Sequence, residues 1–495
     1  MAAGGKESGL ARGDRIALAV LVALGVALRL SQVDLYTAYW ADETHQYLEQ
    51  AYRLLTGTGL VPWEYVAGLR SWLLPLLLAG PMALGSAIGG AAGGIFAARA
   101  IVFVAALAMM PAAFAIGRTV SRGHALAALG AVALWFEIVT WSAHVLTETI
   151  SITAFLVAAA LLMTRRGARA TAAAGALLAF AAIMRVQHGP ALGVFAVLML
   201  KGDWTRWRAL ILGAVPVVAV SSAVDLGFGQ WPFEWIWQNY DHTVAGDRGA
   251  AFGEQPATWY FAAMGAHWLV ALPVLLFGVV KAPAAMRPLI WAALINIAAH
   301  MMIGHKEYRY IALSLVVLVM VGAIGWVGVR RQTRARRIAV PLVVAGVSAL
   351  SLGLALRGPE DLDSIQESTM PRLEALAVHD PGTCGIAAIG PGVWAVTRHV
   401  MDRQVPLYLF NGDKIAAAQG PAGTGFNRAI AAAAPGPGLA GPGYAGLAPA
   451  GYRPTGSCNG EGADRVCLYR REGGCRVSAA GAPFEIQRYR RDRGL

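Results

Sequence analysis

Residues 41–72 read ADETHQYLEQAYRLLTGTGLVPWEYVAGLRSW, and this polar stretch directly follows the first long apolar run of the chain. It opens with two adjacent carboxylates, Asp42 and Glu43. Apolar residues then recur at helical spacing, which predicts an amphipathic helix over residues 44–55 that Gly57 ends. A helix of this kind, tethered by a membrane span, is expected to lie flat on the bilayer surface. It would hold the two acids at the membrane face.

The composition is typical of a membrane protein with many spans. The chain has 495 residues, of which 57% are hydrophobic and 14% charged, and its mean hydropathy is +0.52. Soluble domains carry about 25% charged residues. The net charge of +12 comes from short basic clusters between apolar runs, which is the pattern of cytoplasmic loops. We therefore expect the lipid bilayer as a partner, and no nucleic acid.

Apolar runs follow one another as far as residue 356. They lie at roughly 15–33, 71–117, 125–142, 149–164, 170–184, 189–200, 207–226, 259–280, 288–303, 308–329 and 338–356. The first follows basic residues and is interpreted as a signal anchor with its N-terminus inside. Only one crossing fits the charge pattern around 71–117, so part of 71–94 is expected to be re-entrant or interfacial. The expected total is about 11 crossings, and up to 13.

An odd number of crossings places the region after residue 356 outside the cytoplasm. Its four cysteines, the only ones in the chain, then predict disulfides, with three possible connectivities; four reduced thiols are the alternative. Short apolar runs at 385–389, 405–410 and 465–469 predict strands, and the Gly- and Pro-rich stretch 420–456 predicts a loop. The sequence thus predicts an α-helical polytopic membrane domain over 1–356, with outer loops 34–70 and 227–258, and a small α/β extracytoplasmic domain over 357–495.

Ionisable side chains gather near the outer ends of the expected spans. They are Arg29, Glu137, Glu148, Arg185 and Asp225, with the segment His305–Arg309 opening a further span. Such groups are costly in a membrane and usually line a cavity or polar pathway. Cations on the outer side also go against the positive-inside preference, so an external anion such as a lipid phosphate is expected there. Together with the carboxylates of residues 42 and 43, this favours group transfer from a lipid phosphate, in which a base deprotonates an acceptor hydroxyl.

Several polar residues of the chain also have a structural interpretation. Asp42 could be the N-cap of the helix that follows it. Glu64 and Arg70 could form a structural ion pair, and His188 and His300 could be polar contacts within the helix bundle. Convergence on one side of the membrane favours the functional interpretation.

Four stretches of the chain carry a resemblance to a known family. They are ADETHQYLEQAYRLLTGTGLVPWEY with GLRSWLLPLL, HVLTET around Glu148, GQWPFEWIWQNY with GEQPATWYF, and HKEYRYI at 305–311. Over roughly residues 15–330 the chain resembles the dolichol-pathway type of mannosyltransferase, glycosyltransferase family 22 of the GT-C superfamily. HKEYRYI is similar to the HKEERF-type motif of that family. Here Tyr308 stands in place of the second acid of the motif, and His144 stands where a basic residue often precedes the second-loop acid.

The resemblance implies a GT-C fold and an inverting transfer of mannose from a polyprenyl-phosphate mannose to a glycan or glycolipid acceptor at the extracytoplasmic face. No cofactor and no obligatory metal are implied. Asp42 would be the general base, with Glu43 as its alternate or an acceptor-binding group. The implied substrate-binding residues are Trp63, Glu64, Arg70, Glu148, His305, Lys306, Glu307 and Arg309. The charge pattern near the span ends adds Arg185 to this set.

Two other functions remain open. Another GT-C transferase would move a different sugar from a polyprenyl phosphate. A transporter of lipid-linked glycans is the second. Transporters place charged residues near the membrane midplane and are often built from repeats, whereas here the charges lie at one face and the sequence shows no repeat. The Ala-, Gly- and Arg-rich composition favours a bacterium, and hence the cytoplasmic membrane with the site facing the periplasm.

Overall fold

The structure is a computed structural model in which residues 11–37, 39–245, 253–329, 346, 353, 370–389, 396–410, 425–432, 447–459 and 465–475 are described. The chain forms two compact units. The first comprises Met1–Val33 and Val102–Ser364, and the second comprises Asp34–Ile101 and Ile365–Leu495. The first outer loop therefore belongs with the C-terminal region, whereas the sequence grouped it with the membrane domain. The expected span over 338–356 falls outside the described residues, except at the isolated residues 346 and 353.

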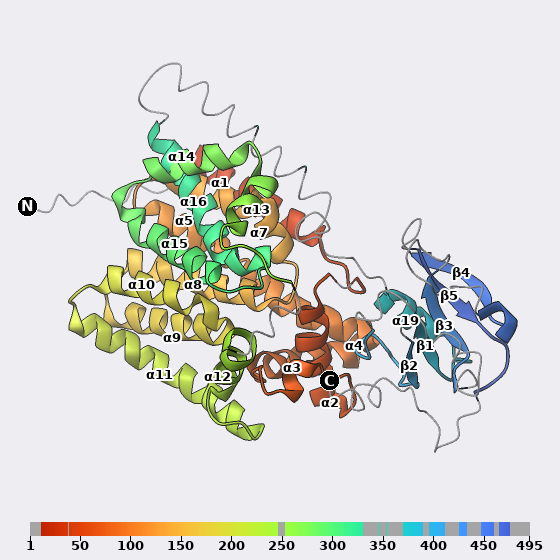
Figure 1. The fold of residues 1–495 in the computed structure, drawn as a ribbon. Coiled ribbons are helices and arrows are strands. Elements are labelled where there is room, and N and C mark those ends of the chain that lie inside the picture. Colours follow the sequence, from red (N-terminus) through yellow and green to blue (C-terminus); the bar gives the residue numbers. More distant parts are fainter. Residues whose placement is uncertain are drawn as a thin grey trace, which may run out of the picture. The chain divides into compact units, whose positions relative to one another are not determined.

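Helices make up the regular structure of the first unit in the part that is described (Figure 1). Its α-helices are α1 (Arg12–Leu30), α5 (Met109–Arg118), α6 (Arg122–Leu134), α7 (Phe136–Trp141), α8 (Thr147–Thr164), α9 (Ala168–Met184), α10 (Gly189–Leu200), α11 (Trp204–Gly227), α12 (Glu234–Tyr240), α13 (Trp259–Trp268), α14 (Ala271–Lys281), α15 (Arg287–Met301) and α16 (Ala312–Val329). Short 3-10 turns, η2 (Val186–His188) and η6 (Tyr308–Ile311), precede α10 and α16.

Glycines let several of these helices pack with their backbones in contact. A Cβ atom on Gly175 of α9 would lie 1.9 Å from the carbonyl oxygen of Leu210 in α11. A Cβ atom on Gly213 would lie 1.8 Å from the carbonyl oxygen of Ala172, so the α9–α11 crossing accepts only glycine at both positions. Small residues at helix crossings are typical of membrane bundles, in which close packing takes the place of a hydrophobic driving force.

Five helical segments of the described chain are long and apolar enough to cross a membrane, or six if the bent pair α13–α14 is one span. Three shorter apolar helices accompany them, over 122–134, 168–184 and 186–200. The sequence predicted about 11 crossings, several of them by short apolar runs, and this number is not reached among the described residues. Some expected runs are broken: α13 and α14 meet at 109°, where Leu269 has a φ of 47°. The run 125–142 is divided between α6 and α7 at Trp135, whose backbone is extended.

The expected single run over 71–117 begins with a helical hairpin. Helix α4 (Leu73–Ala106) is interrupted at Gly89 and Gly90, whose backbone angles are not helical. A Cβ atom on Gly85 would lie 2.1 Å from the carbonyl oxygen of Gly93. Eight residues of straight helix span about 12 Å, so the chain must fold back on itself here. The hairpin fits the expectation that part of 71–94 does not form a straight crossing.

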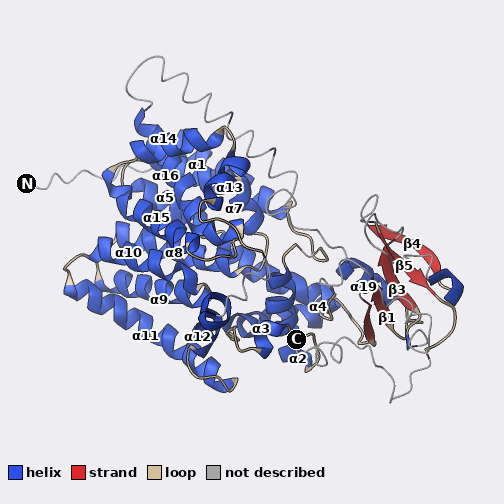
Figure 2. Cartoon of the chain, viewed as in Figure 1, coloured by secondary structure: helices blue, strands red, loops and turns tan. Residues whose placement is uncertain are grey.

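The C-terminal part of the second unit is the small α/β domain that the sequence predicted (Figure 2). Its elements are α19 (Met370–His379), β1 (Ile386–Ile389), β2 (Leu407–Phe410), β3 (Arg428–Ala432), β4 (Arg453–Asn459) and β5 (Val466–Arg470). The sheet order is β2-β1-β3-β5-β4. Strands β2, β1 and β3 are parallel, whereas β5 pairs antiparallel with both β3 and β4.

Three strands and the oxidised cysteines are confirmed, and one loop prediction is wrong. Disulfides join Cys384 to Cys475 and Cys458 to Cys467. Strand β3 lies within the stretch 420–456, which the sequence assigned to a loop. Its sequence RAIAA has one β-branched residue and is surrounded by glycine and alanine, so local propensity does not mark it. Pairing with strands on both sides determines its conformation.

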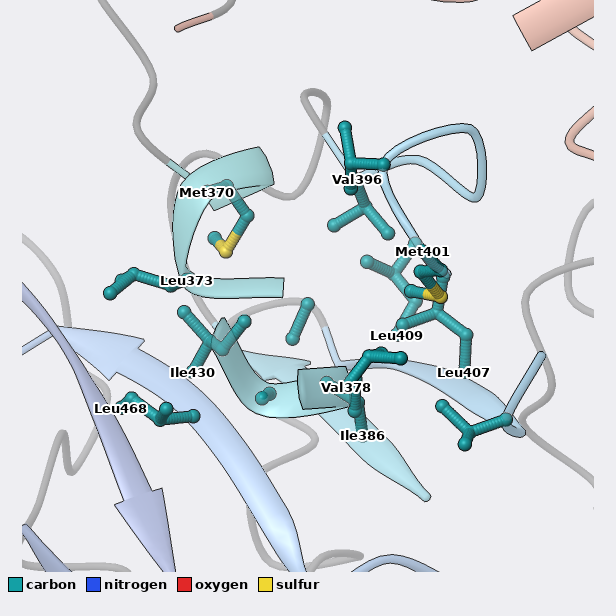
Figure 3. Packing of buried hydrophobic residues seen from close by; sticks show 14 of the residues in the cluster. Met370, Leu373, Val378, Ile386, Val396, Met401, Leu407, Leu409, Ile430 and Leu468 are labelled. Carbon is teal, nitrogen blue, oxygen red and sulfur yellow. The ribbon is translucent and has the colours of Figure 1, made fainter. Parts of the chain in front are cut away.

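The core of this domain includes residues from the first outer loop. Figure 3 shows side chains of α19, among them Met370, Leu373 and Val378, packed with Ile386 and Ile430 of the sheet. The same cluster contains Leu60 and Ile95, which are 0% and 1% exposed and come from the loop and the hairpin. Residues 34–101 therefore share one hydrophobic core with the C-terminal domain.

The helix predicted over 44–55 is confirmed as a π-helical stretch η1 (Asp42–Leu48) followed by α2 (Glu49–Thr56). Gly57 ends it with a φ of +70°. Its surroundings differ from the prediction of a helix lying on the bilayer. Residues 43–51 are all buried, the polar ones as well as the apolar ones. The polar side chains bind protein groups instead of solvent.

Candidate functional site

The first cluster of candidate residues surrounds Asp42 in the second unit. The helix begins at Asp42 itself with Ala41 as its N-cap residue, so Asp42 does not occupy the capping position. Asp42 is partly exposed, and its carboxylate accepts a hydrogen bond from the Gln46 amide at 2.8 Å. The same amide nitrogen donates to Glu64 at 2.9 Å. Gln46, which no motif or charge pattern marks in the sequence, thus holds two acids together.

Glu64 lies on the short helix α3 (Trp63–Val66), which Trp63 opens. Burial raises the pKa of Glu64, and the nearby charge of Arg70 offsets this only in part. The hydroxyl of Tyr65 donates to the carbonyl oxygen of Gln46 at 2.9 Å, which fixes α3 against the helix of Asp42. The structure thus brings Asp42, Glu64 and Arg70 into one neighbourhood.

Glu43 has a different environment from Asp42. Its side chain is fully buried and forms a salt bridge with Nε of Arg99 at 3.1 Å. Arg99 also donates to the carbonyl oxygen of Asp34. Because Arg99 neutralises it within the protein, Glu43 is poorly suited to accept a proton from a substrate. Arg99 was missed, although it is the lone charged side chain in the apolar run 71–117, which is a usual sign of a specific partner.

The second cluster lies in the first unit, where Glu148 at the start of α8 meets two arginines. Its Oε1 is 3.3 Å from Arg185 and 3.5 Å from Arg309. All three side chains are buried. The hydroxyl of Thr147 donates to the other carboxylate oxygen at 3.1 Å. One carboxylate oxygen therefore lies between two guanidinium groups, which is an arrangement suited to any oxyanion.

Glu307 extends this cluster towards the surface. Its carboxylate accepts from Nε of Arg309 at 2.6 Å and from the hydroxyl of Tyr310 at 2.7 Å. Burial would raise the pKa of Glu307, but Arg309, His305 and Tyr310 outweigh it and hold that pKa well below its usual range. The guanidinium of Arg185 lies 4.8 Å from the centre of the Tyr310 ring. Glu148, Arg185, Glu307 and Arg309 thus form one network.

His305 and Lys306 bind a neighbouring loop. His305 donates from Nδ1 to the carbonyl oxygen of Gly253 at 3.1 Å, and its Nε2 lies 3.3 Å from Glu307. Nζ of Lys306 donates to the carbonyl oxygens of Gln255 at 3.0 Å and of Ile303. The ammonium group therefore holds two backbone segments together, and none of its contacts with described residues is with Glu148 or Glu307.

In both His188 and His300, one ring nitrogen forms a hydrogen bond, as expected for polar contacts. The other ring nitrogen forms none with the described residues. The Ser151 hydroxyl donates to the carbonyl oxygen of Ala181, so Nδ1–H of His188 must donate to Ser151 at 2.8 Å. Nδ1 of His300 likewise donates to the carbonyl oxygen of Asn296 at 2.8 Å. This leaves the lone pair of each Nε2 as an acceptor, and neither has a partner among the described residues.

Two of the expected outer charges have structural roles. Arg29 caps the end of α6, since its guanidinium donates to the carbonyl oxygens of Ala133 at 2.9 Å and Val132 at 2.8 Å. Glu137 is fully buried and accepts from the hydroxyl of Tyr308 at 2.6 Å. The indoles of Trp135 and Trp268 donate to the same carboxylate at 2.9 Å each. The tyrosine that replaces an acid in the motif therefore anchors the motif in the bundle.

Comparison with known proteins agrees with this architecture. The bovine GPI alpha-1,2-mannosyltransferase 3 is 26% identical over 325 residues, which are 60% of this chain and 57% of that protein. The Drosophila melanogaster GPI mannosyltransferase 3 is 45% identical over 56 residues, 11% of this chain and 10% of its own. The matches thus span just over half of one curated relative and a tenth of the other.

Solved structures of glycosyltransferases share the fold. ArnT from Cupriavidus metallidurans, bound to undecaprenyl phosphate, has a TM-score of 0.59 at 13% identity, with 93% of this chain and 98% of that chain covered. The arabinofuranosyltransferase AftD from Mycobacteria has a TM-score of 0.51 at 17% identity, with 98% of this chain and 43% of that chain covered. These likenesses establish the GT-C fold that the sequence predicted.

The model of the Alg9-like mannosyltransferase family matches residues 20–371, which contain both clusters of candidate residues and the motif at 305–311. This range covers most of the chain and all the stretches in which the sequence resembled glycosyltransferase family 22. The chain belongs to the Alg9-like mannosyltransferase family.

Proposed function

We propose that this protein is an inverting mannosyltransferase that moves mannose from a polyprenyl-phosphate mannose to a glycan or glycolipid acceptor. The oxygen of an acceptor hydroxyl attacks C1 of the mannose while the bond from C1 to the phosphate oxygen breaks. The hydroxyl proton passes to a base on the protein, and polyprenyl phosphate leaves. Membership of the family and the two curated relatives support mannose as the transferred sugar.

Asp42 is the proposed base. This residue is partly exposed, whereas the side chain of Glu43 is buried and paired with Arg99. The hydrogen bond from Gln46 orients the Asp42 carboxylate, which would accept the proton of the acceptor hydroxyl. Glu64, held by the same amide, would bind the acceptor together with Trp63 and Arg70.

The observation that carries the proposal is the buried network of Arg185 and Arg309 around Glu148. The donor phosphodiester has one negative charge, and a second develops on the leaving phosphate as the bond to C1 breaks. Guanidinium groups stabilise such a charge by paired, charge-assisted hydrogen bonds. Glu148 and Glu307 neutralise the two arginines in the absence of donor, so the phosphate would compete with Glu148 for them. We assign His305 a part in orienting Glu307. Lys306 would stabilise the loop at Gln255 without contacting the donor.

The remaining features of the proposal concern setting and partners. The polyprenyl-phosphate sugar, the acceptor and the bilayer would be the partners, as undecaprenyl phosphate is for ArnT. We place the reaction at the extracytoplasmic face, in the cytoplasmic membrane of a bacterium with the site towards the periplasm. The disulfides of the C-terminal domain support an oxidising compartment. No metal is required in this mechanism, so EDTA should leave the rate unchanged; a loss that Mn²⁺ or Mg²⁺ restores would contradict this.

A transfer assay tests the proposal. Purified protein is incubated with polyprenyl-phosphate mannose and a panel of mannose-containing acceptors, with polyprenyl-phosphate glucose and polyprenyl-phosphate arabinose as alternative donors. Mannose transfer with at least one acceptor, and slower or no transfer from the other donors, would support it. Preference for another sugar would favour the second candidate, a GT-C transferase with a different donor. The observation in favour of that candidate is Tyr308, which stands where the family motif has an acid. Movement of lipid-linked glycan across vesicles without a new glycosidic bond would indicate a transporter.

A further inference from the structure

Glu49 ties the helix that starts at Asp42 to a distant part of the chain. It lies seven residues after Asp42 and is fully buried. Its carboxylate accepts from the backbone N–H of Leu60 at 2.8 Å, within the same outer loop. It also accepts from the backbone N–H of Arg398 at 3.0 Å, and from the backbone N–H and Nδ1 of His399 at 2.9 and 2.8 Å.

This site is built for a carboxylate. A buried carboxylate without donors would be costly, whereas four donors converge on this one. Burial would raise the pKa of Glu49, but His399 and the backbone donors outweigh burial and hold it below its usual value. Glu49 is therefore ionised at neutral pH, and each of its hydrogen bonds is charge-assisted.

Other contacts join the same two parts of the second unit. Leu60, whose N–H binds Glu49, belongs to the same hydrophobic cluster as Met370 and Leu373 of α19. At the tip of the α4 hairpin, Asp402 accepts from the backbone N–H of Ala91 at 2.6 Å. Arg372 forms an ion pair with Asp34 at 2.8 Å. The family match ends at residue 371, so all three polar partners, Arg372, His399 and Asp402, lie beyond it.

We propose that Glu49 is a positioning residue: through residues 398–399, the C-terminal domain sets the placement of the helix that carries Asp42. This inference rests on the proposed function of Asp42. Seven residues of helix span about 10 Å, so a rotation of about 6° at Glu49 would move Asp42 by about 1 Å. A misplacement of that size at a reacting group can lower a rate by about 100-fold.

The test uses the full-length protein and four variants. Glu49→Gln removes the charge, and His399→Phe keeps a ring but removes the Nδ1 donor. His399→Asn restores a donor close to the Nδ1 position. Glu374→Gln is the matched control, because Glu374 is also buried and accepts from the backbone N–H of the neighbouring Thr397 at 3.1 Å. For each variant, kcat, donor KM and amide hydrogen exchange over residues 42–62 and 397–401 are measured.

Glu49→Gln and His399→Phe should lower kcat about 10- to 100-fold with donor KM within about twofold of wild type. Exchange over residues 42–62 should accelerate in both variants, while exchange over α8 stays unchanged. His399→Asn and Glu374→Gln should resemble wild type. Unchanged exchange over 42–62 in both impaired variants would overturn the inference, and so would faster exchange with normal kcat. If wild-type protein transfers no mannose while exchange responds as expected, the proposed function fails and the coupling to the C-terminal domain stands.

Discussion

Nε of Arg99 lies 3.1 Å from the carboxylate of Glu43, and both side chains are buried. The adjacent Asp42 is partly exposed. Two neighbouring acids that the sequence could not separate thus have different environments. Removing one partner of a buried pair leaves an uncompensated charge and costs about 3–5 kcal/mol.

Glu43→Gln should therefore act on stability and not on chemistry. The expected result is a large fall in the melting temperature and in the yield of folded protein, with kcat per folded molecule close to wild type. The double variant Glu43→Gln/Arg99→Met removes both charges and should recover much of the loss. A Glu43→Gln protein that folds as well as wild type and transfers no mannose would make Glu43 the base instead.

Arg185 and Arg309 should control the use of the donor. Replacing either by lysine keeps a charge but loses the planar pair of donors, so donor KM should rise about 10- to 100-fold, equivalent to about 1.4–2.8 kcal/mol. Steady-state kinetics over a range of donor concentrations measures this change. Lys306→Met is the comparison, since that ammonium group holds backbone carbonyls: it should lower thermal stability with donor KM unchanged. Unchanged donor KM in both arginine variants would remove the phosphate role.

The link between residues 253–255 and 303–307 should weaken as pH rises. The hydrogen bond to Glu307 raises the pKa of His305, and burial only partly opposes it. A histidine whose pKa is raised by folding contributes its full stabilisation at a pH below its pKa in the unfolded chain, which is about 6.5. This stabilisation is lost as the pH rises through its pKa in the folded protein. Proteolysis or hydrogen exchange near Gly253 should accelerate on the alkaline side of that value.

His305→Asn should abolish this pH dependence. Glu307 does not titrate in the same window, because its pKa is lowered and its contribution disappears only in strong acid. A pH-independent loop in wild type would show that the imidazolium does not stabilise it.

The two disulfides should contribute unequally to stability. Cys384 and Cys475 are 91 residues apart, and Cys458 and Cys467 are 9 apart. In the chain-entropy model, closing the longer loop contributes about 4–5 kcal/mol and closing the shorter one about 2–3 kcal/mol. Paired Cys-to-Ser variants, unfolded by denaturant, measure the difference. Equal losses would contradict this ordering, and thiols that react with a reagent added to the cytoplasmic side would contradict the topology.

Much of the fold could be predicted from the sequence because apolar composition and periodicity carry it. The membrane class, the helix after Asp42 and three strands are of this kind. The hairpin in α4 could be located only as a departure from a straight span, since its turn depends on Gly89 and Gly90. Strand β3 was missed because its alanine-rich sequence becomes a strand only through its neighbours.

Only part of the candidate site could be predicted from the sequence. Charged residues near span ends identified Glu148, Arg185 and Arg309, because an unpaired charge there would be too costly. Their grouping around a single carboxylate oxygen depends on tertiary packing, which no local pattern encodes. Gln46 and Glu49 look in the sequence like ordinary polar residues of an amphipathic helix. Their partners could not be predicted, because Glu64 lies 18 residues from Gln46 and His399 lies 350 residues from Glu49. Lys306 was predicted from its charge on the outer side and from the motif, and its hydrogen bonds are to backbone carbonyls.

The most direct measurement compares wild type with Asp42→Asn in a single turnover with saturating polyprenyl-phosphate mannose and acceptor. The amide keeps the shape of the side chain and can still bind Gln46, but it cannot accept the hydroxyl proton. General-base catalysis is worth about 100- to 10,000-fold, so the rate of mannose transfer should fall by that factor while donor affinity and thermal stability stay at wild-type values. Full transfer by Asp42→Asn would contradict the account.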